Sequence, residues 1–497
     1  MKIKTFILSA IALTFYSCEP LDETPFSSIS ENNIYQNEKD VDIALMGVYS
    51  SLNIGIDDLW YLLSTSGPGE SIVIRLKGDG TQGRLSSMNF IAQDGQMHAW
   101  WTNFYRGINR SNTIIANIPS AGLEPELEDQ KIAEARFLRG FFYFNLVKRY
   151  GGVPLHLEAT TDFSDESVKK PRATIEEVYE VIIEDLKYSE TRLPPEWDAA
   201  NKGRATSGAG NALLGKVYLN MAGKPLEQED KYSLAVEKLS EVVQSGEYVL
   251  QDNFENIFAN DNEFNSEIIF ARPNIREEGA GTSLNFWAGV PNSPYTIVSQ
   301  YQFGFTEKFY NSFSSRDKRR DITLLYSYID KEGREVTYND PNNPPLLFDY
   351  ADPNGIGFGK VIDSGNQTSL MTYNSDIIYI RFADVLLMLA EGLNEIGQSN
   401  EALIYLNMVR DRAGLENIAT TDKNQLLEII KQERKWELAG EYQEYPDLQR
   451  WGDIEKSLSN NEDAIFYGAT YDPKMELMAI PQSQLDANEN LEQNPGY

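Results

Sequence analysis

The sequence holds few residues with the chemistry of a nucleophilic or metal-dependent active site. Of its 497 residues, two are histidines, His98 and His156, and one is a cysteine, Cys18. A single thiol excludes a disulfide framework and a cysteine-based zinc site, and two distant imidazoles leave little material for histidine catalysis. We therefore predict no cofactor, no catalytic metal and no role for either histidine in ligand binding. Calcium stays open, because its oxygen ligands are abundant in this sequence.

Two glycine runs match phosphate-binding loops only in their letters. Gly78 to Gly83 reads G-x-G-x-x-G, but a dinucleotide site needs a helix there whose N-terminus takes the pyrophosphate. Arg84 to Asn89 shows no amphipathic helix and no βαβ unit follows, so the run predicts a turn. Gly355 to Lys360 lacks the P-loop spacing and the Ser or Thr that should follow its lysine.

Carboxylates are the remaining candidates for catalysis. The chain has 75 Asp and Glu against 44 Lys and Arg, which gives a formal net charge of −31. Nucleic acid is not expected as a partner, because phosphate binding needs basic stripes and none is visible. Most of these acids should be solvated. We predict that the protein is not an enzyme; the alternative is a surface glycosidase that uses two loop carboxylates, whose separation a sequence does not reveal.

The amino terminus predicts export and a lipid anchor. Lys2 and Lys4 precede the apolar run Phe6 to Tyr16, which is too short to span roughly 30 Å of hydrocarbon and is typical of a signal peptide. The sole cysteine follows at the processing position, as in a bacterial lipobox, although Phe15 and Tyr16 stand where leucine and a small residue are usual. Residues 1–17 are therefore expected to be removed, with Cys18 as the lipidated first residue of the mature protein.

Surface exposure is predicted by the residues that follow the cysteine. Glu19 to Glu23 is mostly acidic and resembles the export signal of surface lipoproteins in Bacteroidetes. No other apolar run approaches eighteen residues, so the protein should be tethered to the membrane and not embedded in it.

Amphipathic helices dominate the rest of the chain. Apolar residues at spacings of three and four predict helices over 131–150, 175–193, 207–222, 229–243, 378–396, 399–412 and 422–439. Thr174 and Glu177 form a capping box, and Gly246 is a candidate left-handed helix end. Trp100 and Trp101 begin a further helix and are expected to pack in the core.

Two helix pairs have tetratricopeptide-like spacing. The first is marked by Leu214, Gly215 and Tyr218 with Ala235, Leu239 and Val242; the second by Leu389, Ala390 and Leu393 with Ala402, Leu406 and Val409. Small residues at these positions let two helices approach closely. The fold class is therefore predicted as mainly α, with a tetratricopeptide-like scaffold.

Long irregular segments separate these helices. Residues 52–97 and about 247–375 are rich in Gly, Pro, Asn, Ser and aromatic residues, with short strand-like runs at 71–76 and 267–271. Loops of this length are usually functional or disordered, and their aromatic content favours a folded, functional role. We expect one domain over residues 18–497 that carries both segments.

Several segments together resemble the SusD/RagB family of nutrient-binding outer-membrane lipoproteins. The segments are Ala133 to Arg139, Tyr150 to Leu155, Arg204 to Thr206, Tyr379 to Leu387, Val409 to Gly414, Glu433 to Leu438, Asp447 to Gly452 and Gln493 to Tyr497. They follow the order of the family along the whole chain. One departure falls at 440–446, where Glu444 replaces a usual arginine.

The resemblance implies a protein that binds and does not catalyse. Members of this family cap a SusC-like TonB-dependent transporter and capture oligosaccharides, or in RagB-type relatives peptides, at the cell surface. Their motif arginines are mostly structural, so Arg136, Arg139, Arg381 and Arg412 should tie helices together through carboxylate pairs.

Sugar-binding residues must come from the loops, because sugars need aromatic faces flanked by polar side chains. In the first loop-rich segment the candidates are Trp60, Tyr61, Arg75 and Arg84; in the second they are Asn285, Trp287 and Tyr295. Buried packing under a loop is the competing interpretation of each tryptophan. Trp436 and Trp451 belong to the family segments and are expected to be structural.

Overall fold

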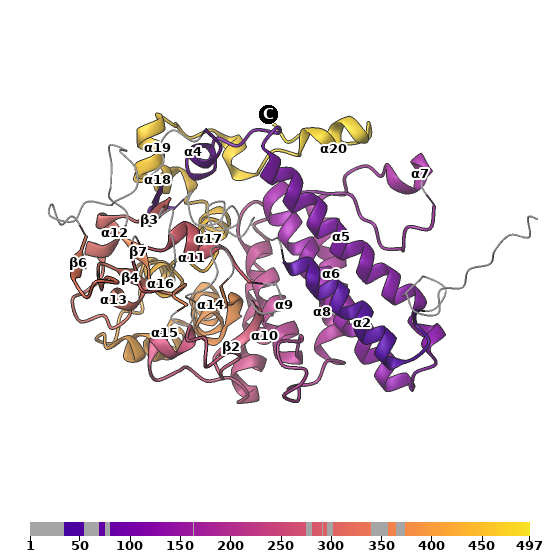
Figure 1. The fold of residues 1–497 in the computed structure, drawn as a ribbon, viewed down its shortest axis with the longest axis horizontal. Helices are drawn as coiled ribbons and strands as arrows, with labels where there is room; N and C mark the ends of the chain where they lie inside the picture. Colours follow the sequence, from indigo (N-terminus) through magenta and orange to yellow (C-terminus); the bar gives the residue numbers. More distant parts are fainter. Residues whose placement is uncertain are drawn as a thin grey trace, which may run out of the picture.

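The computed structural model describes residues 34–53, 69–74, 80–162, 164–274, 281–290, 292–295, 302–338, 356–363 and 373–497. Four of the predicted site residues, Cys18, Trp60, Tyr61 and Arg75, lie outside these ranges. The protein is mainly helical, with short two-stranded sheets (Figure 1), as predicted. Within the described residues no helix is long and apolar enough to cross a membrane.

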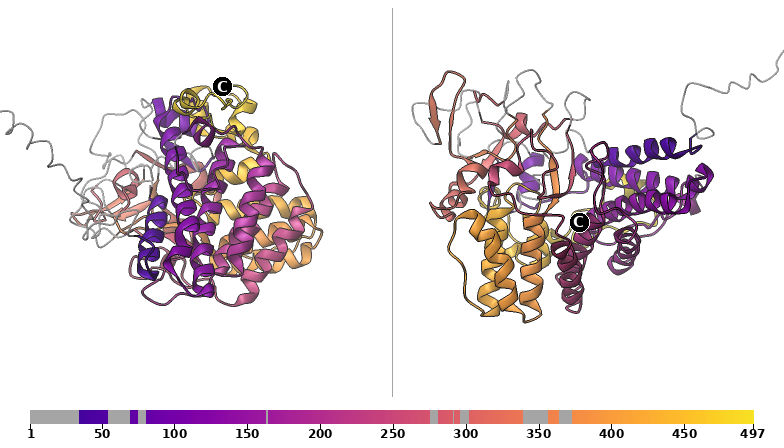
Figure 2. Two further views of the ribbon diagram at one scale, coloured as in Figure 1. Left: turned by 90° about the vertical axis from the view of Figure 1, so that its right-hand side faces the viewer. Right: turned by 90° about the horizontal axis from the view of Figure 1, so that it is seen from below.

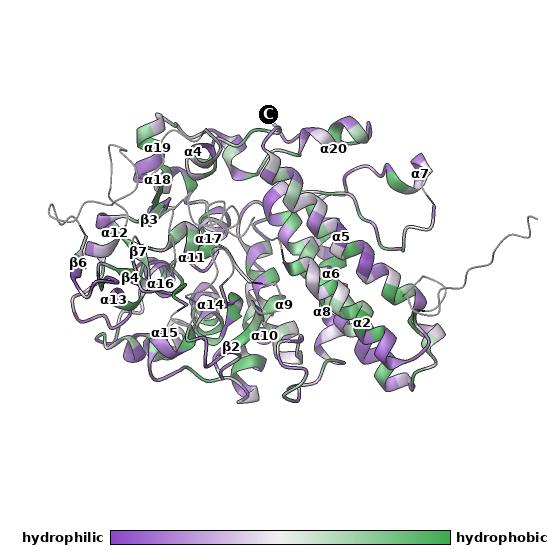
Figure 3. Ribbon diagram, in the orientation of Figure 1, coloured by the Kyte–Doolittle hydropathy of each residue, from purple (hydrophilic) through white to green (hydrophobic). Residues whose placement is uncertain are grey.

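A continuous array of antiparallel helices forms the scaffold. Its first members are α2 (Glu38–Tyr49), α5 (Gly95–Asn117), α6 (Pro125–Tyr150) and α8 (Ile175–Glu190). Neighbouring helices in this group pack against one another, and α8 leads on to α9 (Ser207–Ala222). Trp100 and Trp101 are buried in α5, as expected. Hydrophobic and hydrophilic residues alternate along α5 (Figure 3), which presents an apolar stripe to its neighbours, whereas α6 is buried on nearly all sides between Ala133 and Val147.

The predicted helix signals at this end of the array are present. The Thr174 hydroxyl accepts the Glu177 N–H while the Glu177 carboxylate accepts the Thr174 N–H, which completes the capping box of α8. The helix predicted over 131–150 begins six residues earlier, at Pro125, because proline suits the first turn of a helix.

The tetratricopeptide-like pairs continue the array. Helix α9 packs against α10 (Lys231–Ser245), which packs against α14 (Phe382–Glu395); α14 contacts α15 (Ser399–Ala413) and α16 (Lys423–Glu437). A Cβ added to Gly215 would lie 2.6 Å from Cγ of Leu239, so only glycine permits this approach of α9 to α10. Gly246 ends α10 with φ of 72°, as the sequence predicts.

One predicted helix begins later than expected. Residues 378–381 belong to strand β8 (Ile377–Arg381), which pairs antiparallel with β2 (Ile268–Arg272); α14 starts only at Phe382. A run with isoleucine and tyrosine suits a strand as well as a helix, and the partner strand decides between them. Among the described residues, the predicted strand-like runs contain strands at Ile72–Ile74 and Ile268–Arg272.

The other described strands form small sheets on one side of the helical array (Figure 2). They are β1 (Ile72–Ile74) with β3 (Phe303–Phe305), β4 (Leu324–Leu325) with β7 (Gly357–Phe358), and β5 (Ser327–Ile329) with β6 (Glu335–Thr337). The turn predicted for Gly78 to Gly83 is wrong in part, because Gly80–Ser86 forms the short helix α4. No βαβ unit is built there, since β1 pairs antiparallel with β3.

Short helices complete the described chain. They are α7 (Asp165–Val168), α11 (Leu284–Ala288), α12 (Glu307–Ser312), α13 (Arg320–Thr323), α17 (Glu444–Trp451), α18 (Ile454–Leu458), α19 (Glu462–Tyr467) and α20 (Gln482–Ala487). After α20, Asn494 contacts a distant helix end: its Nδ2 donates to the carbonyls of Tyr150 and Met478, and Arg172 donates to its Oδ1. These contacts hold the last residues of the chain at the C-terminal end of α6.

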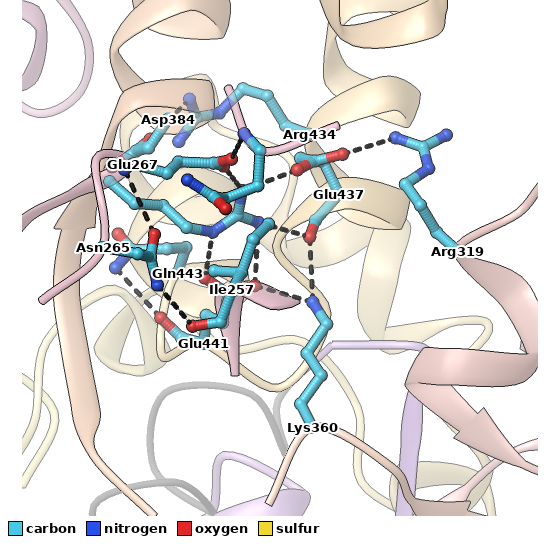
Figure 4. A network of polar contacts seen from close by, with 12 residues as sticks. Ile257, Asn265, Glu267, Arg319, Lys360, Asp384, Arg434, Glu437, Glu441 and Gln443 are labelled. Carbon is cyan, nitrogen blue, oxygen red and sulfur yellow. Dashed lines mark hydrogen bonds and ion pairs between the residues drawn. The ribbon is translucent and has the colours of Figure 1, made fainter. Parts of the chain in front are cut away.

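A buried network of charged side chains joins β8, α16 and the loops around them (Figure 4). Arg381 pairs with Glu267, Glu437 and Glu441, while Arg319 also reaches Glu437 at 2.7 Å. Burial opposes ionisation of Glu437, but the surrounding arginines hold the pKa of its carboxyl well below the usual range. The network fixes the orientation of α16 relative to the strands.

The motif arginines have the structural role that the sequence predicts. Arg139 makes two hydrogen bonds to Asp185, at 2.8 and 2.7 Å, and so joins α6 to α8. Arg136 lies 3.8 Å from the same carboxylate. Arg412 pairs with Glu267 and Glu437 in the buried network. These guanidinium groups are therefore occupied by carboxylates of the scaffold.

Candidate ligand-binding surface

Strands β1 and β3 join the two loop-rich segments that the sequence marks as candidate ligand-binding regions. Ile72 is the register partner of Phe305, and the Thr306 N–H donates to the carbonyl of Ser71 at 2.8 Å. A further bridge links Phe305 to Ile356. Parts of 52–97 and 247–375 therefore lie side by side, on the strand-bearing side of the array (Figure 2).

Trp287 lies on α11, next to these strands. Its carbonyl accepts the N–H of Gln302, one residue before β3, at 2.8 Å. Its ring is half-buried and meets Phe286 edge to face, with ring centroids 4.7 Å apart. The indole Nε1 is buried and has no hydrogen-bond partner among the described residues. Part of the ring is thus accessible, while the N–H is not presented to solvent.

Asn285 and Tyr295 come together around a small cavity of about 10 Å³ whose wall also includes Val290 and Phe358. That volume accommodates about one water and no sugar ring. Asn285 is only 2% exposed, and its Oδ1 accepts the Ser375 hydroxyl at 3.3 Å. Its amide therefore packs inside the protein in this structure, whereas Tyr295 is half-buried.

Arg84 is engaged by a neighbour within the same segment. Its guanidinium pairs with Asp94 and also donates to the Thr81 hydroxyl at 3.1 Å. The side chain keeps 28% of its surface exposed. A ligand that contacts Arg84 would have to share its guanidinium with the buried carboxylate of Asp94.

Glu444 holds the segment that leads into β1. In the sequence this residue is notable only as a departure from the family pattern. The carboxylate accepts the Glu70 N–H at 3.0 Å and the Ser71 hydroxyl, and Lys435 lies 3.8 Å away. Burial raises the pKa of this carboxyl. The carboxylate serves here as a hydrogen-bond acceptor for an amide and a hydroxyl donor of the segment leading into the strand.

The two histidines contact different partners. His98 is exposed and its Nδ1 lies 2.7 Å from the Ser483 hydroxyl, whereas the His156 ring packs edge to face on Tyr105. Burial lowers the pKa of His156. Among the residues that the structure describes, no three His, Cys, Asp or Glu side chains are grouped closely enough to hold a metal ion.

Asp376 links the second loop-rich segment to the scaffold and gives a pH-dependent prediction. Its Oδ1 accepts the Asn274 N–H at 2.9 Å. Burial, with a contribution from Glu263, raises its pKa from 3.8 to about 7. Because the folded state binds this proton more tightly than the unfolded chain, the stability it contributes is complete below about pH 4 and is lost as the pH rises through 7.

The measurement is urea unfolding of the wild type and of Asp376→Asn at pH 4, 6 and 8. The amide keeps the hydrogen bond without the charge, so the variant should match the wild type near pH 4 and exceed it at pH 8. A constant difference across this range would contradict the prediction.

The comparisons with known proteins agree with this architecture. Residues 299–497 match a family model described as SusD family, and residues 78–219 match one described as starch-binding associating with outer membrane. The chain is 28% identical to SusD-like protein P2 of Formosa agariphila, over 99% of each chain. It is 24% identical to a SusD-like protein of Bacteroides ovatus, over 91% of this chain and 83% of that one.

Solved structures show the same fold. A SusD homolog from Bacteroides thetaiotaomicron superposes with a TM-score of 0.83 at 24% identity, over 94% of this chain and 99% of that one. A laminarin binding SusD-like protein superposes with a TM-score of 0.78 at 26% identity, over 93% and 100%.

Fold and comparisons together identify the class. A tetratricopeptide-like helical array with small sheets on one side is the architecture shared with these structures. The chain belongs to the SusD-like family.

Proposed function

We propose that this protein is a surface lipoprotein that binds oligosaccharides and delivers them to a SusC-like TonB-dependent transporter of the outer membrane. The observation that carries the proposal is the SusD-like fold over nearly the whole chain, shared with a relative that binds laminarin. The strand-bearing side adds support, because it brings both loop-rich segments together beside a partly accessible tryptophan.

The proposed ligand contacts are Trp60, Tyr61 and Arg75 from the first segment, and Trp287 and Tyr295 from the second. Arg84 and Asn285 could contact a ligand only after their side chains move, since Arg84 is paired with Asp94 and Asn285 is buried. An aromatic platform with polar neighbours suits a neutral sugar chain.

Replacing Trp287 by alanine should weaken glycan binding while the fold survives. Loss of a stacking ring should cost about 1–3 kcal/mol of binding free energy. The ligand is chosen on a glycan array, with laminarin as the first probe, and affinity is then measured by calorimetry beside the melting temperature. Trp60→Ala should behave in the same way.

The matched control is Trp100→Ala, because Trp100 is fully buried in α5. That change should cost about 3–5 kcal/mol of folding stability. If Trp287→Ala instead lowers the melting temperature strongly, or leaves the affinity unchanged, Trp287 is not the stacking residue. Tyr61 or Tyr295 would then be the residue to test. Release of shortened glycan during the array experiment would favour the glycosidase.

The proposed anchor is a lipid on Cys18, which follows the short apolar run of the amino terminus. Cys18→Ala should remove the protein from the outer-membrane fraction, and mass spectrometry of the N-terminal peptide should show lipid only in the wild type. Unchanged fractionation of the variant would refute the anchor without bearing on glycan binding.

A further inference from the structure

A cavity of about 410 Å³ lies among helices of the scaffold, apart from the candidate ligand-binding surface. Its wall is formed by the end of α6, by α8 and α9, by α17 and by residues 471–477. None of its lining residues belongs to 52–97 or 247–375. The volume falls within the range of roughly 300–1,000 Å³ that small-molecule sites occupy.

Lys148 lines this cavity, and its amine forms no ion pair with the described residues. Its Nζ lies 4.3 Å from the centroid of the Phe144 ring. Within the described chain this Nζ makes no hydrogen bond and no ion pair. Burial, together with the positive charges of Lys216 and Arg149, lowers the pKa of this amine well below its usual range, and the nearby carboxylates of Asp447 and Asp384 offset this only in part. A bound anion would relieve that penalty.

The neighbouring cations already have carboxylate partners. Lys216 lies 3.0 Å from Asp384, and Lys224 lies 2.5 Å from Glu227. Arg450 pairs with Asp447 and with a glutamate of α14. Since these charges are satisfied, Lys148 is the cation of the wall that forms no ion pair with the described residues.

The remaining wall offers polar groups and rings. Tyr179 and Tyr471 line the cavity, and the Tyr471 hydroxyl donates to Glu476 at 2.9 Å. Asn220 donates to the carbonyl of Lys216 and keeps its Oδ1 without a partner in the described chain. A carboxylate and an amide oxygen accept hydrogen bonds, so they suit hydroxyl groups and not a second anionic group.

We propose that this cavity binds a small hydroxylated carboxylate, such as a sugar acid, with its carboxylate paired to Lys148. The anionic end of such a molecule supplies the missing counter-ion. Its hydroxyl groups match the acceptors Glu476 and Asn220, while the negative charge of Glu476 disfavours a ligand that carries a second anionic group near that wall. The inference stands on the scaffold cavity and does not depend on glycan binding at the loop surface.

The test is calorimetric titration of the full mature protein with D-glucuronate, beside D-glucose as the neutral match. Lys148→Met keeps the packing on Phe144 and removes the charge. We expect glucuronate to bind, glucose to bind at least tenfold more weakly, and Lys148→Met to lose at least tenfold in glucuronate affinity.

Lys456→Met is the matched control, because that lysine is 64% exposed and pairs with Glu428 outside the cavity. It should bind glucuronate like the wild type. Trp287→Ala should also keep glucuronate binding, which separates this site from the proposed glycan surface. The proposal is overturned if glucuronate does not bind, if glucose binds equally well, or if Lys148→Met, folded by its melting temperature, binds it unchanged.

Discussion

Replacing Arg381 by methionine should lower the free energy of unfolding by about 3–5 kcal/mol. Arg381 is 1% exposed and pairs with Glu267 at 2.8 Å, with Glu437 at 2.6 Å and with Glu441 at 2.6 Å. Methionine fills much of the volume but leaves three buried carboxylates with less compensation. Urea unfolding of both proteins at neutral pH measures the difference.

Two companion variants make this result specific to the network. Lys456→Met breaks an exposed pair with Glu428 and should cost no more than about 1 kcal/mol. Arg381→Lys keeps the charge but loses the forked donors, so it should fall between methionine and the wild type. A loss below about 1 kcal/mol for Arg381→Met would show that the network does not support the fold as described.

Gly152→Ala should destabilise the protein by about 3 kcal/mol, at the upper end of overpacking effects. A Cβ on Gly152 would lie 2.1 Å from the carbonyl oxygen of Ala173. That atom belongs to the backbone just before α8, so no side-chain rotation relieves the clash. Denaturant unfolding at constant pH measures the loss.

The control is a glycine with space around it. Gly47 lies within α2 and has no atom within 4 Å of an added Cβ. Alanine has the higher helix propensity, so Gly47→Ala should stabilise by about 0.5–1 kcal/mol. If both substitutions destabilise equally, the close approach at Gly152 is not the cause.

The helical scaffold could be predicted from the sequence because its signals are local. The capping box at Thr174 and Glu177 and the left-handed end at Gly246 each depend on residues only a few positions apart. The start of α14 could not be placed in this way. Ile377–Arg381 suits either a strand or a helix, and its partner β2 lies more than a hundred residues earlier.

The candidate site was harder to predict because burial is a property of the folded chain. Local sequence identified the two loop-rich segments, but not the pairing of β1 with β3 that joins them. Nothing near Asn285 indicates that Ser375 donates to its amide oxygen. Arg84 and Asp94 are only ten residues apart, yet many such pairs occur in so acidic a sequence.

The contacts of Asn494 have a consequence for the order in which parts of the protein fold. The last carbonyls of a helix have no partner inside it, and at α6 the Tyr150 carbonyl accepts from Asn494 and Arg172. Arg172 follows Tyr150 by 22 residues and Asn494 follows it by 344, so the arginine contact can form early whereas the asparagine contact needs almost the whole chain. Contacts this distant in sequence close slowly. The Tyr150 carbonyl therefore gains its second hydrogen-bond partner only at a late stage of folding.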